Sequence, residues 1–429
     1  MRKWICVMLL LANMITLTLR SFLSMSIILM VRSPESNASL IDIGKLDWPQ
    51  RWIPVLFSIP LLGWLASSLI LFLFLSNWRH EKFSVLVAIL LESALTIAMP
   101  SIAEHSFAAF AFARFFLGFG EGFVIKSLNV LIANWFPPAE RIFAVAIFSC
   151  GTQISFGVAQ YFVALLEQFQ YSWHWAFIIF GTFGTIFSIL WYIVMTDSPL
   201  GNRYVRQEEL EYLKGALPKP TTQEKIPVPW RALLECRAVR VHLLCMLAIN
   251  FTVGLSSAFL PTYFKEEIRL PISSNGLFTA APFVVQMVSK LGVGAIIDWR
   301  KRRGLSHTAA AKICHREPLH CFVALLCFGA TSSIAILGFY TTMTMIAPRF
   351  TGTVVSFILL IGALATLSST LVFTAFNYYD FAWKYTACFG LAAVLQVAAG
   401  IAYLLWGSGE AQPWALEDSR SKDELLLSK

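Results

Sequence analysis

The sequence predicts an all-α polytopic membrane protein. Its 429 residues are 57% hydrophobic and 14% charged, and the mean hydropathy is +0.67, which is not a composition of soluble globular domains. Apolar runs of about 20 residues recur along the chain, and that is the length an α-helix needs to cross a bilayer. The formal net charge is +8, and the basic residues gather in the loops between the runs. The preference of such loops for the cytosolic side explains them without a nucleic-acid partner.

Six apolar runs make up the first half of the chain. The first, residues 1–31, begins with Arg2 and Lys3, which favour a cytosolic N-terminus. We interpret it as an uncleaved span, because it is too long for a signal peptide and lacks a small-x-small cleavage site. A polar loop, 32–51, follows on the opposite side and holds an N-glycosylation sequon at Asn37. The other predicted spans are 52–76, 84–103, the stretch 113–141, 142–166 and 175–196.

A basic polar segment, 197–240, divides the chain. We expect it to be a cytosolic linker between an N-terminal bundle, 1–196, and a C-terminal bundle, 241–406. The second bundle has predicted spans at 241–263, 275–297, 321–347, 354–376 and 385–406. The total is about eleven, whereas a transporter built from two repeated halves would have twelve. An odd count predicts that the tail, 407–429, lies on the side opposite the N-terminus.

Charged residues inside the runs are the candidate functional residues. Each costs roughly 3 kcal/mol at the bilayer centre on insertion scales, so such residues usually face a bundle interior and have a function. Arg20 lies more than two turns from either end of the first span, where a bundle-facing role and a snorkelling arginine are the alternatives. Arg114 and Glu121 lie two turns apart, about 10 Å along the axis, on nearly one face of span four.

Span four also carries Lys126, which lies roughly 140° around the helix from Glu121 and is expected to snorkel or pack. Span three carries Glu92. Three glycines keep span four thin enough for close approach of neighbouring helices, namely Gly118, Gly120 and Gly122. A guanidinium recognises carboxylate or phosphate in a planar, bidentate way. A carboxylate beside it can be poised to exchange a proton. The pattern therefore indicates a transport helix that handles anions.

Other chemistry is weakly represented in the sequence. It has no G-x-S-x-G, no H-E-x-x-H and no phosphate-cradling glycine loop, which argues against an enzyme, and no Walker motif of an ATP-driven pump. The eight cysteines are scattered without a C-x-x-C pair, so we expect no disulfide framework. Four possible zinc ligands lie close together but without zinc-finger spacing, at Cys314, His315, His320 and Cys321. We predict neither a metal nor a cofactor.

Seven motifs occur in order along nearly the whole chain. They are R-x-x-x-G-x-x-E-G at 114–122, W-x-P-P-x-E-R at 135–141, W-H-W-x-F at 173–177 with F-G at 180–181, D-S-P at 197–199 with E-x-x-Y at 209–212, L-P-T-Y-F at 260–264, I-A-P-R-F at 346–350 and G-S-G-E-x-Q-P-W at 407–414. With this set the chain resembles the anion/cation symporter branch of the major facilitator superfamily, which includes sodium/phosphate cotransporters, sialin and vesicular glutamate transporters.

The resemblance implies a fold and a function. The fold is two six-helix bundles that alternate access to a central site. The function is secondary active transport of organic or inorganic anions, driven by protons, sodium or membrane potential. Arg20 and Arg114 match arginines that face the family's central cavity and bind substrate, and Glu121 matches a glutamate linked to proton coupling. An Arg114–Glu121 ion pair that only holds span four in the bundle is the structural alternative, and both roles can hold.

Several positions depart from the family pattern. The cytosolic gate after span eight is matched by Asp298, Arg302 and Arg303, but the corresponding first-half turn, 77–82, lacks the glycines and the aspartate. Phe57 stands where glutamate-transporting relatives have a histidine.

Ile249 stands where those relatives have an arginine, so glutamate is not expected as the substrate. Lys290 is either a substrate-binding cation that compensates for this loss or a lysine that reaches towards the cytosolic interface.

Motif order identifies span nine as the missing element. Either the gene model skips an exon or this isoform does not transport, and the intact motifs on both sides favour the missing exon. We therefore expect a multi-pass transporter of a small anion, moved with H⁺ or Na⁺ through the lipid bilayer of the plasma membrane or of a vesicle or lysosome. The alternative is a non-transporting scaffold or receptor that kept the fold, favoured by the missing span and the eroded first gate.

Overall fold

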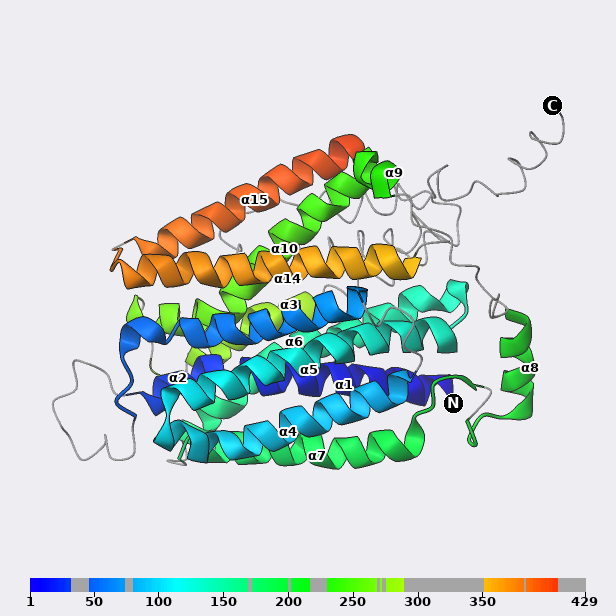
Figure 1. Ribbon diagram of the computed structural model, residues 1–429, viewed down its shortest axis with the longest axis horizontal. Helices are drawn as coiled ribbons and strands as arrows, with labels where there is room; N and C mark the ends of the chain where they lie inside the picture. Colours follow the sequence, from blue (N-terminus) through cyan, green and yellow to red (C-terminus); the bar gives the residue numbers. More distant parts are fainter. Residues whose placement is uncertain are drawn as a thin grey trace.

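The computed structural model describes residues 1–31, 46–73, 80–168, 172–199, 202–216, 230–267, 271, 275–288, 351–381 and 383–407. Within these ranges the chain forms a bundle of long α-helices lying side by side (Figure 1). Seven of the described helices are long and apolar enough to cross a membrane. The expected all-α multi-pass fold is confirmed, and the count of about eleven spans stays a prediction because 289–350 lie outside the described ranges.

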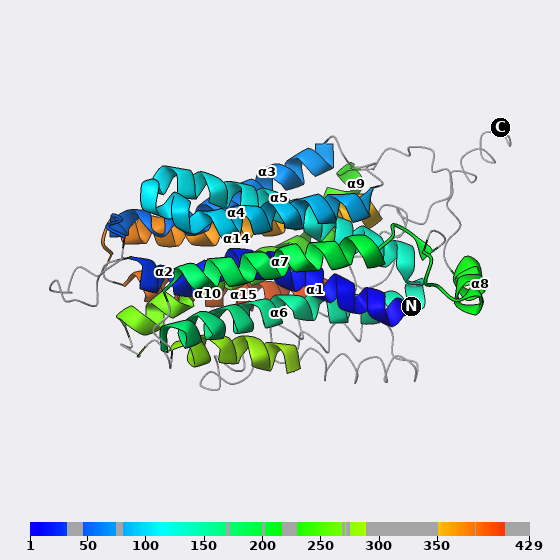
Figure 2. The same cartoon turned by 90° about the horizontal axis from the view of Figure 1, so that it is seen from below.

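The first half supplies the helices α1 to α7. Their bounds are α1 (Arg2–Ser21), α2 (Leu23–Met30), α3 (Val55–Leu73), α4 (Glu81–His105), α5 (Phe107–Trp135), α6 (Pro138–Gln168) and α7 (His174–Val194). Each lies on a predicted apolar run. α5 begins earlier than predicted because Ser106 caps it, its Oγ accepting a hydrogen bond from the backbone N–H of Ala109 at 3.3 Å. α1 is the central helix, in contact with α4, α5, α6 and α7 (Figure 2).

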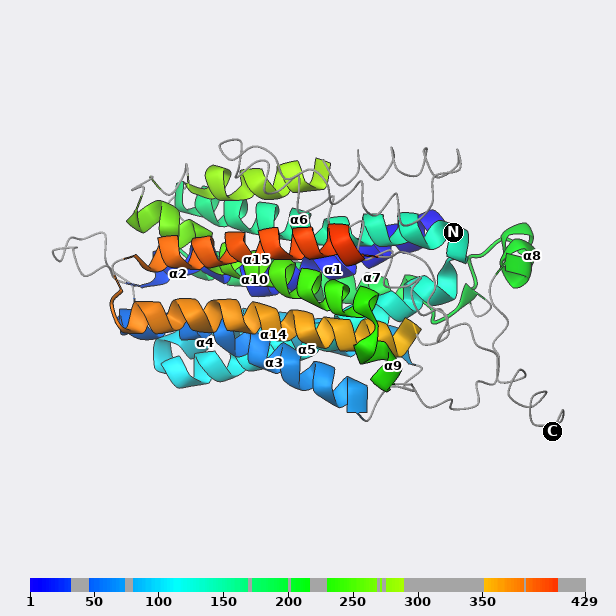
Figure 3. The same ribbon diagram turned by 90° about the horizontal axis from the view of Figure 1, so that it is seen from above.

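The second half supplies four described helices that match predicted spans. They are α10 (Arg237–Glu266), the apolar helix Asn275–Val288, α14 (Thr351–Tyr378) and α15 (Lys384–Trp406). The halves meet where α3 lies beside α14 (Figure 3) and where Gly157 and Gly276 bring α6 close to the Asn275–Val288 helix. The predicted span at 321–347 lies outside the described residues.

Two helices lie in the polar segment that was predicted only as a linker: α8 (Gln207–Ala216) and α9 (Trp230–Glu235). Both lie at the end of the bundle that holds the N-terminus, here called the linker end (Figure 1). α15 also ends there, because Tyr403 in its last turns packs with Leu233 of α9 and with His242 of α10, whose ring centroid lies 5.4 Å away. The expectation that the chain leaves the last span opposite the N-terminus is therefore wrong for Gly407, the last described residue.

Glycines set the distance between α5 and its neighbours, as predicted. A Cβ added at Gly118 would lie 1.7 Å from the backbone oxygen of Pro60 in α3, and one at Gly63 in α3 would lie 2.0 Å from the oxygen of Phe115. Both obstructing atoms belong to the backbone, so they cannot move away by a change of side-chain rotamer. The two helices therefore pack backbone to backbone, which brings the charged face of α5 into the centre of the first half.

The linker end is held by an ion pair between α1 and α8. The Nε of Arg2 donates to Glu209 Oε1 at 3.0 Å, and the N-terminal ammonium of Met1 lies 2.9 Å from Oε2. The Arg2 guanidinium also lies over the ring of Tyr212, 5.1 Å from its centroid. Burial alone acts to raise the pKa of Glu209, but the hydrogen bonds from the ammonium and from Arg2 outweigh it and lower the pKa below its ordinary value.

Replacing Gly118 with alanine is expected to separate α3 from α5. The overlap with Pro60 predicts a loss of about 1–3 kcal/mol or more in the free energy of unfolding, measured by thermal or denaturant unfolding in detergent. Gly390→Ala is the matched control, because nothing lies within 4 Å of a Cβ at that helical glycine. Equal stability of the two variants would contradict this account of the α3–α5 contact.

The lowered pKa of Glu209 predicts a pH-dependent contact between α8 and α1. The stabilisation is present at neutral pH, where the carboxylate is ionised in both folded and unfolded chains, and it is lost as the pH falls through the folded pKa. Comparing thermal unfolding of the parent with Glu209→Gln should show a difference at neutral pH that vanishes in acid. Glu208→Gln, an exposed neighbour, should show no such difference. A difference in unfolding temperature between the parent and Glu209→Gln that does not change with pH would refute the pH dependence of this contact.

Candidate functional site

The site is built at a short break in the first membrane helix. α1 ends at Ser21 and α2 begins at Leu23, while Phe22 between them keeps helical angles and donates to the carbonyl of Thr18, so the break is a local distortion of one membrane helix. The carbonyls beside it use other donors. The carbonyl of Arg20 accepts a hydrogen bond from Nη2 of Arg114 at 3.0 Å. The carbonyl of Ser21 accepts one from the Ser24 hydroxyl at 2.8 Å and one from Gln160 of α6 at 3.3 Å. Side chains from α2, α5 and α6 thus satisfy the carbonyls of a locally distorted helix at membrane depth.

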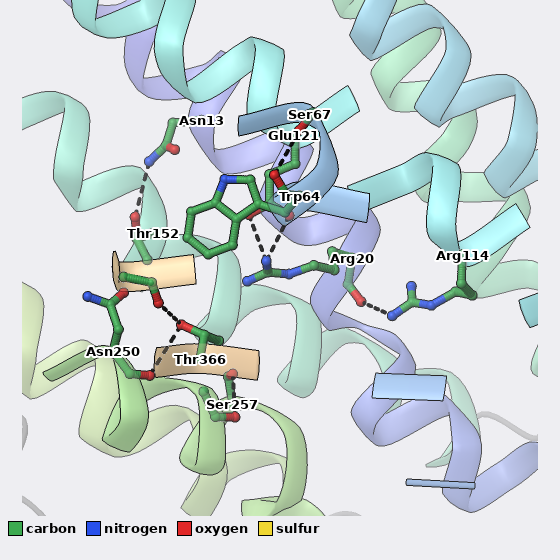
Figure 4. A network of polar contacts seen from close by, with 12 residues as sticks. Asn13, Arg20, Trp64, Ser67, Arg114, Glu121, Thr152, Asn250, Ser257 and Thr366 are labelled. Carbon is green, nitrogen blue, oxygen red and sulfur yellow. Dashed lines mark hydrogen bonds and ion pairs between the residues drawn. The ribbon is translucent and has the colours of Figure 1, made fainter. Parts of the chain in front are cut away.

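Arg20 projects from this break onto Glu121 of α5 (Figure 4). Its Nη1 lies 2.7 Å from Oε1 and 2.8 Å from Oε2 of the carboxylate. The Arg20 side chain is 14% exposed and that of Glu121 is 2% exposed, so the pair is almost fully withdrawn from solvent. The ring centroid of Trp64 in α3 lies 6.0 Å from the guanidinium carbon of Arg20. Arg20 therefore faces the bundle interior, and the snorkelling alternative is wrong.

Arg114 lies on the other side of Arg20 (Figure 4) and is 2% exposed. Its hydrogen bond to the Arg20 carbonyl uses one nitrogen, and its Nε is buried with no hydrogen-bond partner among the described residues. The structural alternative of an Arg114–Glu121 ion pair is wrong, because the carboxylate of Glu121 is paired with Arg20 instead. Two turns of α5 separate the residues, and the helix break places Arg20 between them.

Both arginines line a narrow cavity of about 30 Å³ between the two halves. Hydroxyl groups from both halves complete much of the lining, contributed by Ser21, Ser24, Ser257, Thr366 and Thr370. A space of this size holds water but not an organic anion. The helices must therefore separate before a larger solute can reach the arginines.

The halves touch beside this cavity at the end away from the linker end. Ser58 Oγ of α3 donates to Thr370 Oγ1 of α14 at 3.0 Å. The rings of Phe57 and Phe259 pack edge to face with centroids 5.4 Å apart. Phe57, singled out in the sequence, therefore lines the cavity and also belongs to the contact that closes it.

The other predicted site residues are placed less completely. Ile249 is 5% exposed and packs in a cluster with Ile358 and Ala399, so the structure puts it in the core of the second half and not in the cavity lining. Lys126 packs as expected, its Nζ paired with the carboxylate of Glu81 at the start of α4. Outside the described residues lie Asn37, Lys290, Asp298, Arg302, Arg303 and the group Cys314, His315, His320 and Cys321.

Sequence reasoning missed a role of Asp197 at the linker end. Its Oδ1 accepts a hydrogen bond from the backbone N–H of Lys82 at 2.7 Å, and its carbonyl accepts one from Asn134 at 3.1 Å. A carboxylate at this position stabilises the start of α4. Asp197 belongs to the D-S-P motif, so that motif joins α4, α5 and α7 beside the turn whose gate motif is eroded. Among the described residues no group of three or more His, Cys, Asp or Glu side chains could hold a metal ion.

The model of the Major Facilitator Superfamily matches residues 9–370 of the chain. The chain belongs to this superfamily. It is 28% identical over 416 residues to "Uncharacterized transporter slc-17.3" of Caenorhabditis elegans, covering 89% of this chain and 76% of that protein. It is 25% identical over 374 residues to vesicular glutamate transporter 3 of Danio rerio, covering 82% of this chain and 63% of that protein. The chain thus spans less than two thirds of that glutamate transporter.

A solved superfamily structure has the same fold. The crystal structure of a bacterial homologue of the human lysosomal transporter Spinster, inward-facing and unoccupied, aligns with a TM-score of 0.62 at 14% identity, covering 96% of this chain and 99% of that one. The major facilitator fold is confirmed, and the relatives confirm the resemblance to the anion/cation symporter branch.

Removing one partner of the Arg20–Glu121 pair should destabilise the superfamily fold. Arg20→Met leaves a buried carboxylate without a cation, at a cost of about 3–5 kcal/mol, and the double variant Arg20→Met/Glu121→Leu should recover most of it. Unfolding in detergent gives the double-mutant cycle. The control is Arg231→Met, whose ion pair with Glu235 has side chains 92% and 67% exposed and contributes about 1 kcal/mol or less. A double variant no more stable than Arg20→Met would count against the pair.

Proposed function

We propose that the protein is a secondary active transporter that moves a small anion by alternating access. The single observation that carries the proposal is Arg114, a guanidinium that lines the cavity between the halves and whose buried Nε has no hydrogen-bond partner in the described part of the chain. Leaving a buried donor unpaired costs about 1–3 kcal/mol, and more for a charged group. An anion in the cavity would remove that cost, since carboxylate and phosphate oxygens fit the guanidinium fork.

Arg20 couples anion binding to proton binding at the site. It is held to Glu121 through Nη1 alone, so the rest of its fork is left for another acceptor. An anion that approaches Arg20 competes with Glu121 for the guanidinium. Protonation of Glu121 ends this competition, because the neutral acid no longer forms an ion pair. Anion binding and proton binding therefore favour each other, which is the thermodynamic basis of proton-coupled symport.

The contacts between the halves suit a conformational switch. They consist of hydroxyl contacts such as Ser58 with Thr370 and of aromatic contacts such as Phe57 with Phe259. Among the described residues, no ion pair joins these helices. Such contacts can separate without exposing a buried charge. Alternating access requires this, since the present cavity is too small for an organic anion.

The same observations favour a transporter over a scaffold. A scaffold that only kept the fold has no need of an incompletely paired arginine at membrane depth, which costs stability. The apolar ring of Phe57 in the cavity lining offers no partner for a second substrate charge. We therefore propose an anion other than glutamate, with phosphate, urate and sialic acid as the first candidates.

Uptake into proteoliposomes with an imposed pH gradient tests the proposal. The parent is expected to take up at least one anion among phosphate, urate and sialic acid, and acidic amino acids serve as the comparison for which no uptake is expected. Arg114→Ala should abolish uptake, and Arg114→Lys, which keeps the charge but loses the planar fork, should raise the KM. Glu121→Gln should leave uptake independent of the pH gradient.

Arg231→Ala is the control, since this arginine is exposed and far from the cavity lining. Variants of Arg114 and Glu121 that transport like the parent would show that the residue roles are wrong. No uptake of any anion by correctly inserted parent protein would refute transport itself.

A further inference from the structure

Glu92 of α4 is a buried acid to which the transport proposal gives no role. The residue is 1% exposed, and both of its carboxyl oxygens are buried with no hydrogen-bond partner among the described residues. An ionised carboxylate without a donor is among the most costly groups that a protein interior can hold. We therefore expect Glu92 to be a neutral acid that carries a proton.

The carboxyl group of Glu92 lies directly against α5, beside Glu121. A Cβ at Gly120 would lie 2.6 Å from Glu92 Oε1, so the absence of a side chain at Gly120 makes the space that the carboxyl fills. Gly120 is the residue before Glu121. Gly120, the second of the three α5 glycines, thus serves to admit an acid from α4, in addition to the close packing of Gly118 on α3.

Each helix packed on α4 presents a small number of groups to Glu92. α1 presents Arg20 and the buried hydroxyl of Thr16, which lies against the Glu92 carboxyl group. α5 presents Glu121, whose charge acts on Glu92. α7 presents no titratable side chain at this depth, because His174 and Tyr192 lie at its two ends. Both carboxyl groups therefore share the cation Arg20, and of the two only Glu121 is paired with it. The charge of Arg114 acts on Glu121 as well.

Two interacting acids that share one cation hold a proton as a pair. We propose that Glu92 is a second proton-holding residue of the transport cycle, which gives its proton to Glu121 and so releases Arg20 to the anion. The proposal rests on the transport function proposed above. In this step the O–H bond of Glu92 breaks and an O–H bond forms on Glu121, with no change in the charge of the pair.

The proton transfer leaves a negative charge on Glu92, which the surrounding groups can accommodate. Once ionised, Glu92 faces the Thr16 hydroxyl, which can donate a hydrogen bond to the carboxylate. Glu92 then regains a proton from the aqueous side from which the anion enters, so that one proton accompanies each anion taken up. When the anion leaves on the opposite side of the membrane, Glu121 releases its proton to that opposite side and pairs with Arg20 again.

Infrared spectroscopy and uptake, both on the full chain, test this role with Glu92→Gln. The amide is close in size and shape to the neutral acid, so the variant is expected to fold. The parent should show the carbonyl band of a protonated buried carboxyl group, and Glu92→Gln should lack it. Uptake by Glu92→Gln should need more acid than the parent, with the acidic limb of the pH profile displaced by about one pH unit or more.

The control is Glu104→Gln on the same helix, where the parent side chain is 53% exposed, and both readouts should match the parent. An unchanged infrared band in Glu92→Gln overturns the proposal whether or not the parent transports. In a parent that transports, an unchanged pH profile overturns the relay. A parent that takes up no anion refutes the transport function instead, and the infrared band then still decides whether Glu92 holds a proton.

Discussion

The ion pair between Arg20 and Glu121 is the interaction on which the rest of the structure depends. It joins the central helix α1 to α5 inside the first bundle, at a depth where neither charge is stable alone. Its formation requires α1 to be interrupted, α5 to lie close to α3, and Arg114 to satisfy the carbonyl that the break exposes. Each of these features alone would lower the stability of the bundle, and the contacts that it makes with the others compensate for this. The site and the fold of the first half therefore depend on each other.

Much of the fold could be predicted from the sequence, because length and hydropathy decide which segments cross a bilayer. The predicted spans of the described regions coincide with α1 to α7 in the first half and with α10, α14 and α15 in the second. The predicted side of the tail was wrong because it followed from an odd number of spans, and one uncertain segment is enough to change an odd count to an even one. Tyr403 shares a buried cluster with Leu233 of α9, which places the end of α15 at the linker end without any count of spans.

The candidate site was predicted in its residues but not in its pairings. Helical periodicity puts Arg114 and Glu121 on one face of α5, and that suggested an ion pair between them. Periodicity within one helix gives no information on what a neighbouring helix inserts, and here α1 inserts Arg20. For the same reason the sequence could not show the contact of Glu92 with Gly120 or the position of Ile249 outside the cavity lining, because both depend on how the helices pack together.

The central claim is that an anion replaces Glu121 as the partner of Arg20, and that a proton enters as it does so. Proton uptake by the purified protein on adding its transported anion, followed with an indicator dye in weak buffer, tests this most directly. The parent should take up protons together with the anion, and Glu121→Gln should take up none. An anion that binds to the parent without any proton uptake would show that it does not displace Glu121 from Arg20 in this way.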